Sequence, residues 1–319
     1  MVSVFPKNDL YGIVCHMIPV FPEFKKLELA DKEAIEQFTK DFPPYSDFDF
    51  ISMYTWNIEG KIFVSELNNN LVVQFADYLT GEPFFSFIGR NLPNETAKLL
   101  LDFSIQKGIV HKLKLIPQDV ADLLDKNTFN IIEDRDSFDY IYDTAEHSNF
   151  SGGNYANKRK EVNAVIRTNP DIEAKSIDIY DSEIQGTMIA LYDKWAGNKL
   201  SDEKMLEKNE GISFKRLINT LNTCENKLSG MGVFSDKQLI AFCIYELMPN
   251  DFAVGHTAKS DNSIKGSNAF LMKALGESLS IAGKKYFNYE QDLGLENLRI
   301  AKERFRPVLY LKKYIVEFK

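Results

Sequence analysis

The sequence is poor in cysteine, glycine and proline, and each shortage excludes a class of protein. Its 319 residues include three cysteines, without a CxxC spacing, so neither a disulfide framework nor a thiolate zinc site is expected. Seventeen glycines and eleven prolines are too few for a collagen-like or low-complexity chain. No apolar run approaches the ~20 residues that a membrane span requires. We therefore expect a soluble protein in a reducing, cytoplasmic compartment.

Several catalytic signatures are also missing. The sequence contains no GxSxG, HExxH or P-loop motif, which argues against common serine hydrolases, zincins and P-loop NTPases. His147 and the carboxylates show no metal-ligand spacing, so no metal is expected. The formal net charge of −8 disfavours a protein coated in nucleic acid. What is present is an ordinary globular composition, with 44% hydrophobic residues and enough length for two domains.

Helix and strand patterns recur in a similar order in both halves of the chain. The expected elements of the first half are a helix, three strands, a helix and a strand, at 31–42, 61–67, 71–76, 83–89, 94–108 and 111–116. Those of the second half lie at 137–143, 157–168, 182–196, 213–221, 231–234, 238–247, 252–257, 268–282, 286–289, 296–305 and 308–316. A polar stretch at 119–130 is the expected join, which predicts domains at residues 1–128 and 129–319.

The amino-terminal segment carries no clear element. Residues 10–21 are mildly apolar, but His16 and Pro19 interrupt them and no A-x-A cleavage pattern follows. We interpret this segment as an extension or an edge strand rather than a signal peptide. Met17 would itself make a plausible chain start, and the sequence leaves that alternative open.

Two segments carry a family resemblance. One reads FPPYSDFDF from Phe42 and continues to MYTW at 53–56, and the other reads NYEQDLGLENLRIAK from Asn288 to Lys302. Together they resemble an uncharacterised bacterial family related to the carboxy-terminal domain of phosphatidylglycerol lysyltransferase. The resemblance extends from about Ile18 to the end of the chain, and its second motif is the more specific.

The resemblance implies both a fold and a reaction. The fold is α/β (α+β), with two tandem GNAT-like acyltransferase domains, mixed and mainly antiparallel sheets, and the active cleft mainly in the second domain, as in the Fem peptidyltransferases. The reaction is transfer of an aminoacyl group from an aminoacyl-tRNA to an amine or hydroxyl acceptor, such as a small molecule, lipid or peptide. An acetyl-CoA-dependent N-acetyltransferase is one alternative. A non-catalytic binding module on the same fold is another.

The loop at 259–268 is the expected site for the donor, either aminoacyl-tRNA or acyl-CoA. A coenzyme A loop needs several glycines because backbone N–H groups must approach the pyrophosphate, and this loop has only Gly266. Lys259, Lys265, Ser267 and the helix that follows could still hold an anion. The alternative interpretation is a surface loop whose serine caps the helix.

Three residues are candidates for the catalytic base. Glu290 and Asp292 follow a predicted strand, and a partly buried carboxylate can be tuned to accept a proton. His256 lies near the end of another strand, where its near-neutral pKa would suit the same task. The structural alternative is that the two carboxylates pair with Arg299 or Lys302, and that His256 is an ordinary buried histidine.

Basic residues gather near the carboxyl terminus. Residues 299–319 hold seven basic and two acidic residues, although the whole chain is acidic. These residues, Lys302 among them, could form a basic wall for the phosphates of tRNA together with Lys158, Arg159 and Lys160. The alternative is a solvated helix and an edge strand whose lysines discourage pairing with other chains. The sequence does not indicate an oligomeric state.

Overall fold

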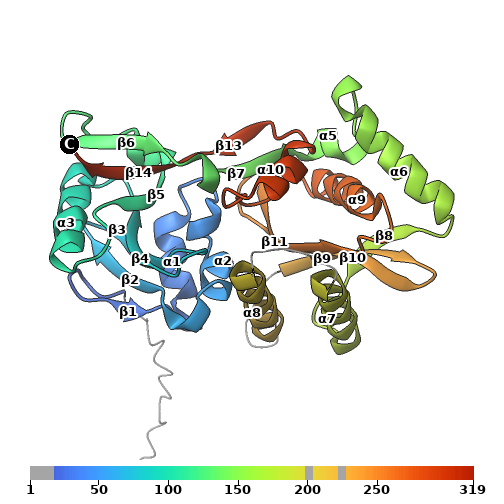
Figure 1. The fold of residues 1–319 in the computed structure, drawn as a ribbon, viewed down its shortest axis with the longest axis horizontal. Coiled ribbons are helices and arrows are strands. Elements are labelled where there is room, and N and C mark those ends of the chain that lie inside the picture. Colours follow the sequence, from blue (N-terminus) through green and yellow to red (C-terminus); the bar gives the residue numbers. More distant parts are fainter. Residues whose placement is uncertain (1–17, 198–203, 222–227) are drawn as a thin grey trace, which may run out of the picture.

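Two halves, each built on its own sheet, make up the molecule (Figure 1). The computed structural model describes residues 18–197, 204–221 and 228–319. The predicted extension, the alternative start at Met17, and the cysteines Cys15 and Cys224 lie outside the described residues. No described helix is long and apolar enough to span a membrane.

The first half contains a seven-stranded sheet with strand order β1-β2-β3-β4-β5-β14-β6. Its strands are β1 (Lys25–Lys26), β2 (Phe63–Leu67), β3 (Asn70–Ala76), β4 (Pro83–Ile88), β5 (Leu113–Pro117), β14 (Lys313–Phe318) and β6 (Phe129–Glu133). Its helices are α1 (Lys32–Thr39), α2 (Phe50–Thr55), α3 (Pro93–Gln106) and α4 (Gln118–Ala121). Asp49 begins α2, because its side chain accepts the Ser52 N–H.

The second half also has seven strands, in the order β13-β7-β12-β11-β10-β9-β8. They are β13 (Leu309–Leu311), β7 (Asp139–Asp143), β12 (Tyr286–Asn288), β11 (Phe252–Ser260), β10 (Gln238–Leu247), β9 (Leu228–Ser235) and β8 (Glu173–Ile177). The helices are α5 (Thr144–Asn149), α6 (Ala156–Thr168), α7 (Ser182–Gly197), α8 (Lys204–Leu221), α9 (Ser267–Ile281) and α10 (Glu296–Glu303).

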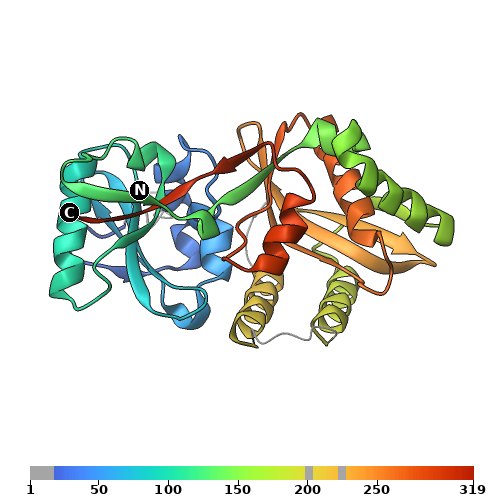
Figure 2. The ribbon, with the colours of Figure 1, turned by 45° about the horizontal axis from the view of Figure 1, so that its top comes forward.

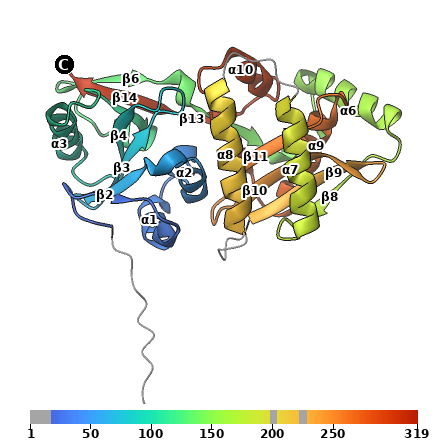
Figure 3. The same cartoon turned by 60° about the horizontal axis from the view of Figure 1, so that its bottom comes forward.

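Helices cover both faces of the second sheet. Figure 3 shows α7 and α8 side by side on one face, and α9 covers the other (Figure 1). A strand covered on both faces has few solvent-facing positions, so β10 reads as a nearly continuous apolar run. Cys243 in this strand is fully buried, which confirms its prediction as a core residue.

The two sheets share one topological feature. In each, a single pair of neighbouring described strands is parallel, and a helix joins its members: β4-α3-β5 in the first half and β11-α9-β12 in the second. All other neighbouring pairs in both sheets are antiparallel. The predicted similarity in element order therefore corresponds to a duplicated architecture.

The carboxyl terminus returns to the first half. The single strand predicted at 308–316 is two strands, β13 in the second sheet and β14 between β5 and β6 in the first (Figure 2). Apart from Lys312 and Lys313, residues 308–316 are apolar or aromatic, so the sequence predicts one strand across the point where the partners change. The domain boundary after residue 128 stays a prediction, and the sheets place both β6 and β14 with the first half.

Candidate active site

The candidate site begins where the parallel strands β11 and β12 diverge. Their pairing covers only 252–254 and 286–288, after which β11 continues and the chain beyond β12 turns away. Residues 255–258 of β11, together with Tyr289, Glu290, Leu298 and Lys302, line a pocket of about 110 Å³ at this point, here called the strand pocket. It lies in the second half of the molecule, where the cleft was expected.

A second pocket of about 110 Å³ adjoins the first. It shares Glu290 and Lys302 with the strand pocket and adds residues of the first half, including Ser52 and Tyr78. We call it the interface pocket. Glu290 and Lys302 therefore border two cavities, one within the second half and one between the halves.

Glu290 is held in an unusual backbone conformation. Its φ is 57°, in the left-handed region that residues other than glycine rarely adopt. Its N–H donates to Asn288 Oδ1 over 2.8 Å, and its carbonyl oxygen accepts the Tyr140 N–H over 3.1 Å. Ser52 Oγ donates to Glu290 Oε1 over 3.1 Å. Burial raises the pKa of the Glu290 carboxyl to about 7, despite the nearby cations.

Lys302 lies beside Glu290 on α10 and is also buried. Its Nζ donates to the carbonyl oxygens of Tyr289 and Gln291, the latter over 2.8 Å, and lies 5.0 Å from the Tyr289 ring centroid. Burial lowers the pKa of Lys302 to about 8, and attraction to Glu290 only partly opposes this. Near neutral pH, both members of this pair can therefore change charge.

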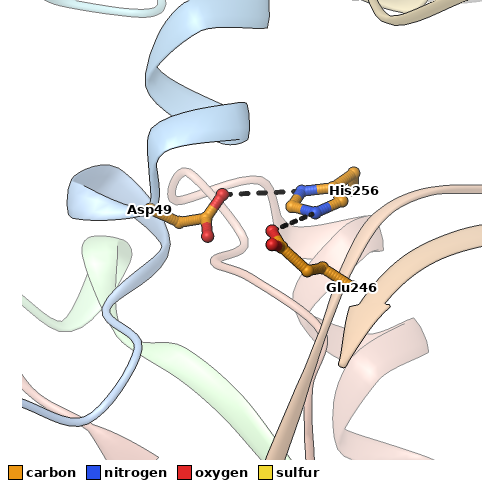
Figure 4. A group of neighbouring side chains, drawn as sticks. All are labelled: Asp49, Glu246 and His256. Carbon is orange, nitrogen blue, oxygen red and sulfur yellow. Dashed lines mark ion pairs between the residues drawn. The ribbon is translucent and has the colours of Figure 1, made fainter. Parts of the chain in front are cut away.

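His256 is flanked by two carboxylates (Figure 4). Its side chain is 1% exposed, with Nδ1 3.7 Å from Asp49 Oδ1 and Nε2 3.7 Å from Glu246 Oε2. Ser52 Oγ lies 3.3 Å from Nδ1. Burial opposes the charged imidazole, but Glu246 and Asp49 outweigh it and raise the pKa of His256.

Among the described residues, Asp49, Glu246 and His256 form the group that could offer three ligands to a metal ion. Their ligand-type atoms lie within 4.8 Å of one another. However, Asp49 and Glu246 approach different ring nitrogens, and one metal ion would bind only one of these nitrogens. This geometry suits an imidazolium between two carboxylates better than a shared ion. The absence of a metal stays a prediction.

Asp292 has a different environment from Glu290. It is fully buried and accepts hydrogen bonds from Arg299, from the Tyr140 hydroxyl over 2.5 Å and from the Gly294 N–H. Burial alone would raise its pKa, but these donors lower it. Asp292 lies outside the lining of both pockets. Its contacts match the structural alternative, in which this carboxylate pairs with Arg299.

The two sequence motifs meet beside the pockets. Asn288 Nδ2 donates to Pro44 O over 2.7 Å, and Gln291 Nε2 donates to Asp47 Oδ1 over 3.1 Å. Lys313 lies fully buried next to them, paired with Asp47 and with Asp139. These contacts connect segments more than 240 positions apart, and they fix Glu290 relative to the first half.

Lys158 and Arg159 lie on α6, away from both pockets. Lys158 is mostly buried, pairs with Glu161 over 3.0 Å and packs 4.0 Å from the Phe305 ring centroid. Arg159 donates to the carbonyl oxygens of Phe150 and Gly152. Lys158 also borders a groove of about 600 Å³ between α6 and α10, here called the basic groove, lined in part by Arg299, Arg304 and Arg306.

The predicted donor loop packs against the protein. A Cβ on Gly266, whose φ is +94°, would lie 2.6 Å from the Glu161 carbonyl oxygen, so this position requires glycine. Gly266 itself occupies the cap position before α9, and the Ser267 hydroxyl donates to Asp261 O instead of capping the helix as predicted. Lys259 pairs with Glu210 over 2.7 Å, while Lys265 is exposed.

Sequence reasoning missed three members of the site: Asp49, Ser52 and Glu246. Asp49 lies within the first resemblance motif and Ser52 just after it, so that motif was the available signal. Glu246 is a single acidic residue at the end of an apolar strand and has no distinguishing pattern. Contacts between the halves, which the sequence does not encode locally, bring these residues to His256.

The comparisons with known proteins identify the family. A family model described as "Phosphatidylglycerol lysyltransferase, C-terminal" matches residues 40–317. The chain belongs to this family. A search of curated proteins gave no significant match.

Solved structures of other proteins have a similar fold over most of this chain. A conserved protein of unknown function from Bacteroides thetaiotaomicron has a TM-score of 0.78 and 24% identity, covering 95% of this chain and 100% of that one. L-PGS from Bacillus licheniformis has a TM-score of 0.61 and 16% identity, with 92% of each chain covered. FemX has a TM-score of 0.54 and 10% identity, covering 92% of this chain and 96% of that one. With the duplicated sheets, these matches confirm the predicted tandem GNAT-like fold.

Proposed function

We propose that this family member is an acyltransferase that moves an aminoacyl group from an aminoacyl-tRNA-like donor to an amine or hydroxyl acceptor. The observation that carries the proposal is Glu290, a half-buried carboxylate that borders both pockets where the strands diverge. Its pKa of about 7 suits a base that accepts a proton at neutral pH. The family match and the likeness to L-PGS and FemX support this class of reaction.

In the proposed reaction, the acceptor nitrogen or oxygen attacks the carbonyl carbon of the aminoacyl ester. Glu290 takes the proton from the acceptor, a bond forms between the acceptor and the carbonyl carbon, and the ester C–O bond to the ribose breaks. Where the acceptor is a hydroxyl, Glu290 passes this proton on to the leaving ribose oxygen. An amine acceptor enters as an ammonium ion and loses two protons, one to Glu290 before the attack and one to the ribose oxygen as the ester bond breaks. His256 does not need to touch the acceptor in this scheme, and Asp292 serves to hold the loop after Glu290.

Lys302 is suited to stabilise negative charge during this reaction. A lysine ammonium has three N–H donors, and the carbonyl oxygens of Tyr289 and Gln291 take two of them. The third donor is available to an oxygen in either pocket that Lys302 borders. We propose that it binds the carbonyl oxygen that becomes negative as the acceptor attacks.

The basic groove supports a donor that carries phosphates. Arg304 and Arg306 in its lining are exposed and supply its positive charge, whereas Lys158 is paired with Glu161 and Arg299 with Asp292. The groove and the pockets lie on different faces of α10, since Leu298 and Lys302 line the pockets while Arg299 and Ile300 line the groove. We assign binding of the tRNA phosphates to this groove, because its exposed arginines are separate from the pockets where the reaction would take place. A tRNA donor agrees with the cytoplasmic location that the sequence predicts.

The experiment that tests the proposal offers one donor at a time to the purified protein. Radiolabelled lysyl-tRNA is mixed with phosphatidylglycerol vesicles or with a small primary amine, and acetyl-CoA replaces the tRNA in a parallel series. We expect transfer from lysyl-tRNA, and a loss of at least about 100-fold in Glu290→Gln. Glu133→Gln, at an exposed carboxylate paired with Lys312, is the matched control and keeps full activity.

Other outcomes contradict specific parts of the proposal. Transfer only from acetyl-CoA would replace it with the N-acetyltransferase alternative. Binding of a donor without turnover would favour the non-catalytic module. Full activity in Glu290→Gln would remove this residue as the base.

A further inference from the structure

Ser52 connects the proposed base to His256. Its Oγ donates to Glu290 Oε1 over 3.1 Å and lies 3.3 Å from His256 Nδ1. Ser52 belongs to α2 in the first half, whereas Glu290 and His256 belong to the second. A single hydroxyl therefore bridges a carboxylate and an imidazole across the contact between the halves.

His256 in turn leads to a larger cavity on its other side. A groove of about 660 Å³ between the halves, here called the interhalf groove, is lined in part by Asp49 and Glu246. Asp49 faces Nδ1 of the imidazole and Glu246 faces Nε2 (Figure 4). The buried Nε2 has no hydrogen-bond partner within bonding distance. The imidazole thus borders the strand pocket, and the two carboxylates beside it border the interhalf groove.

The charges around His256 give the two carboxylates different properties. Burial raises the pKa of Asp49, and attraction to His256 does not offset it. Burial acts in the same direction on Glu246, but His256 and Lys32 outweigh it and lower the pKa of that carboxyl. Asp49 therefore accepts a proton more readily than Glu246. The charged groups that surround the imidazole are Asp49, Glu246, Glu290, Lys32 through Glu246, and Lys302 across the strand pocket.

We propose that Ser52, His256 and Asp49 form a proton exit for amine acceptors, which enter as ammonium ions and carry one proton more than the leaving ribose oxygen needs. The exit carries that proton from Glu290 to water in the interhalf groove, and the proposal rests on the role of Glu290 as the base. The imidazolium first gives its Nδ1 proton to Asp49, 3.7 Å away, which releases it to water. The neutral ring then accepts the Ser52 hydroxyl proton at Nδ1, and Ser52 takes the proton of Glu290.

This sequence of transfers balances. Ser52 and His256 each gain one proton and lose one, and Glu290 returns to the carboxylate form for the next reaction. Glu246 faces Nε2 at 3.7 Å without a hydrogen bond, so it is a positioning residue whose negative charge favours the tautomer with a proton on Nε2. The exit also keeps released protons out of the two small pockets, which the donor and the acceptor would fill.

The first test compares Ser52→Ala with Ser86→Ala in the lysyl-tRNA transfer assay with the small primary amine as acceptor. Ser86 is a matched control because it is buried in β4 and its Oγ has no hydrogen-bond partner. We expect Ser52→Ala and Asp49→Asn to slow transfer roughly tenfold near neutral pH, and added imidazole buffer to restore the rate because it carries the proton instead. Ser86→Ala keeps the wild-type rate. Slowing that is equal at every pH and insensitive to buffer would overturn the exit path.

The second test needs no substrate. Histidine signals are titrated by NMR in the protein without substrate, and His256, one of four histidines, is assigned with His256→Gln. We expect Glu290→Gln and Asp49→Asn each to lower the pKa of His256 by removing a nearby negative charge, and Ser86→Ala to leave it unchanged. If Glu290→Gln leaves the pKa of His256 unchanged, the proposed connection between Glu290 and His256 is overturned, even if the enzyme is active. A wild type without turnover, but with these coupled titrations, would count against the proposed function alone.

Discussion

At the scale of single residues, Glu290 combines three costs that a purely structural carboxylate would avoid. It is half-buried, it has a positive φ, and its pKa of about 7 lies above the ordinary value of 4.5. Among the residues that the structure describes, Glu290 has no salt bridge comparable to that between Asp292 and Arg299. Strain and burial of this kind are frequently found at functional sites.

The pH dependence of stability follows from that raised pKa. The folded protein binds the Glu290 proton more tightly than the unfolded chain, so the resulting stabilisation is present below about pH 4.5 and is lost as the pH rises towards 7. At pH 8, the substitution Glu290→Gln removes a negative charge that partial burial disfavours, which stabilises the fold. It also removes the attraction between Glu290 and Lys302, which destabilises the fold. We expect its free energy of unfolding to equal that of the wild type or to exceed it by up to about 2 kcal/mol.

Thermal unfolding at pH 5 and pH 8 measures this effect. The gain of the variant over the wild type should be larger at pH 8. A variant that is less stable than the wild type at both pH values would show that the carboxylate mainly braces the fold.

The sequence predicted only part of the site, and the reason is visible in particular residues. Glu290 could be predicted because it follows the recognisable strand β12, and His256 because it lies within the recognisable strand β11. Ser52 and Asp49 reach them through contacts between the halves, and no local pattern relates positions 49–52 to 256 or 290. Lys302 was expected to contact the donor, yet its burial next to Glu290 depends on the tertiary structure.

At the scale of elements, strands with strong alternation and clear turns were predicted well. The three-stranded meander β9–β11 has its turns where the sequence predicts them. The polar strand β8 was missed, because an edge strand with one buried residue has no apolar pattern. Helix α8 starts at Lys204 rather than at the predicted residue 213. The change of sheet between β13 and β14 depends on long-range pairing and leaves no local signal.

Strand β14 should be essential to the first half, because it fills the space between β5 and β6. A chain that ends at Lys312 would expose unpaired edges on both strands and would leave Asp47 and Asp139 without Lys313. We expect this variant to lose the cooperative unfolding of the first half and to aggregate. Circular dichroism and urea titration measure the outcome, and a chain that lacks only Lys319 serves as the control. Unchanged unfolding of the shorter chain would contradict the role of β14.

At the scale of the whole molecule, the halves should unfold together. They are connected by two crossings of the chain and by the buried cluster around Lys313. The protein has two tryptophans, Trp56 next to α2 and Trp195 in α7, so each half carries one fluorescent reporter. Variants with a single tryptophan should show the same urea midpoint.

Lys313→Met then tests the coupling between the halves. The substitution leaves two buried carboxylates facing each other, and we expect a loss of about 3–5 kcal/mol that lowers the midpoint of both reporters. Lys312→Met, whose partner Glu133 is exposed, should cost less than about 1 kcal/mol. Different urea midpoints for the two tryptophan reporters before the substitution, or a shift of only one of them after it, would show that the halves unfold independently.

The late position of β14 has a consequence for protein synthesis. A ribosome releases the first half of the chain early, but the strand between β5 and β6 is translated only after the second half. Pairing of Pro117 with Lys313 must wait for the whole second half, and contacts so distant in sequence form slowly. The nascent first half therefore carries an open sheet until β14 has been made, and in that time its edges are available to chaperones or to neighbouring nascent chains. The half that is made first is completed last.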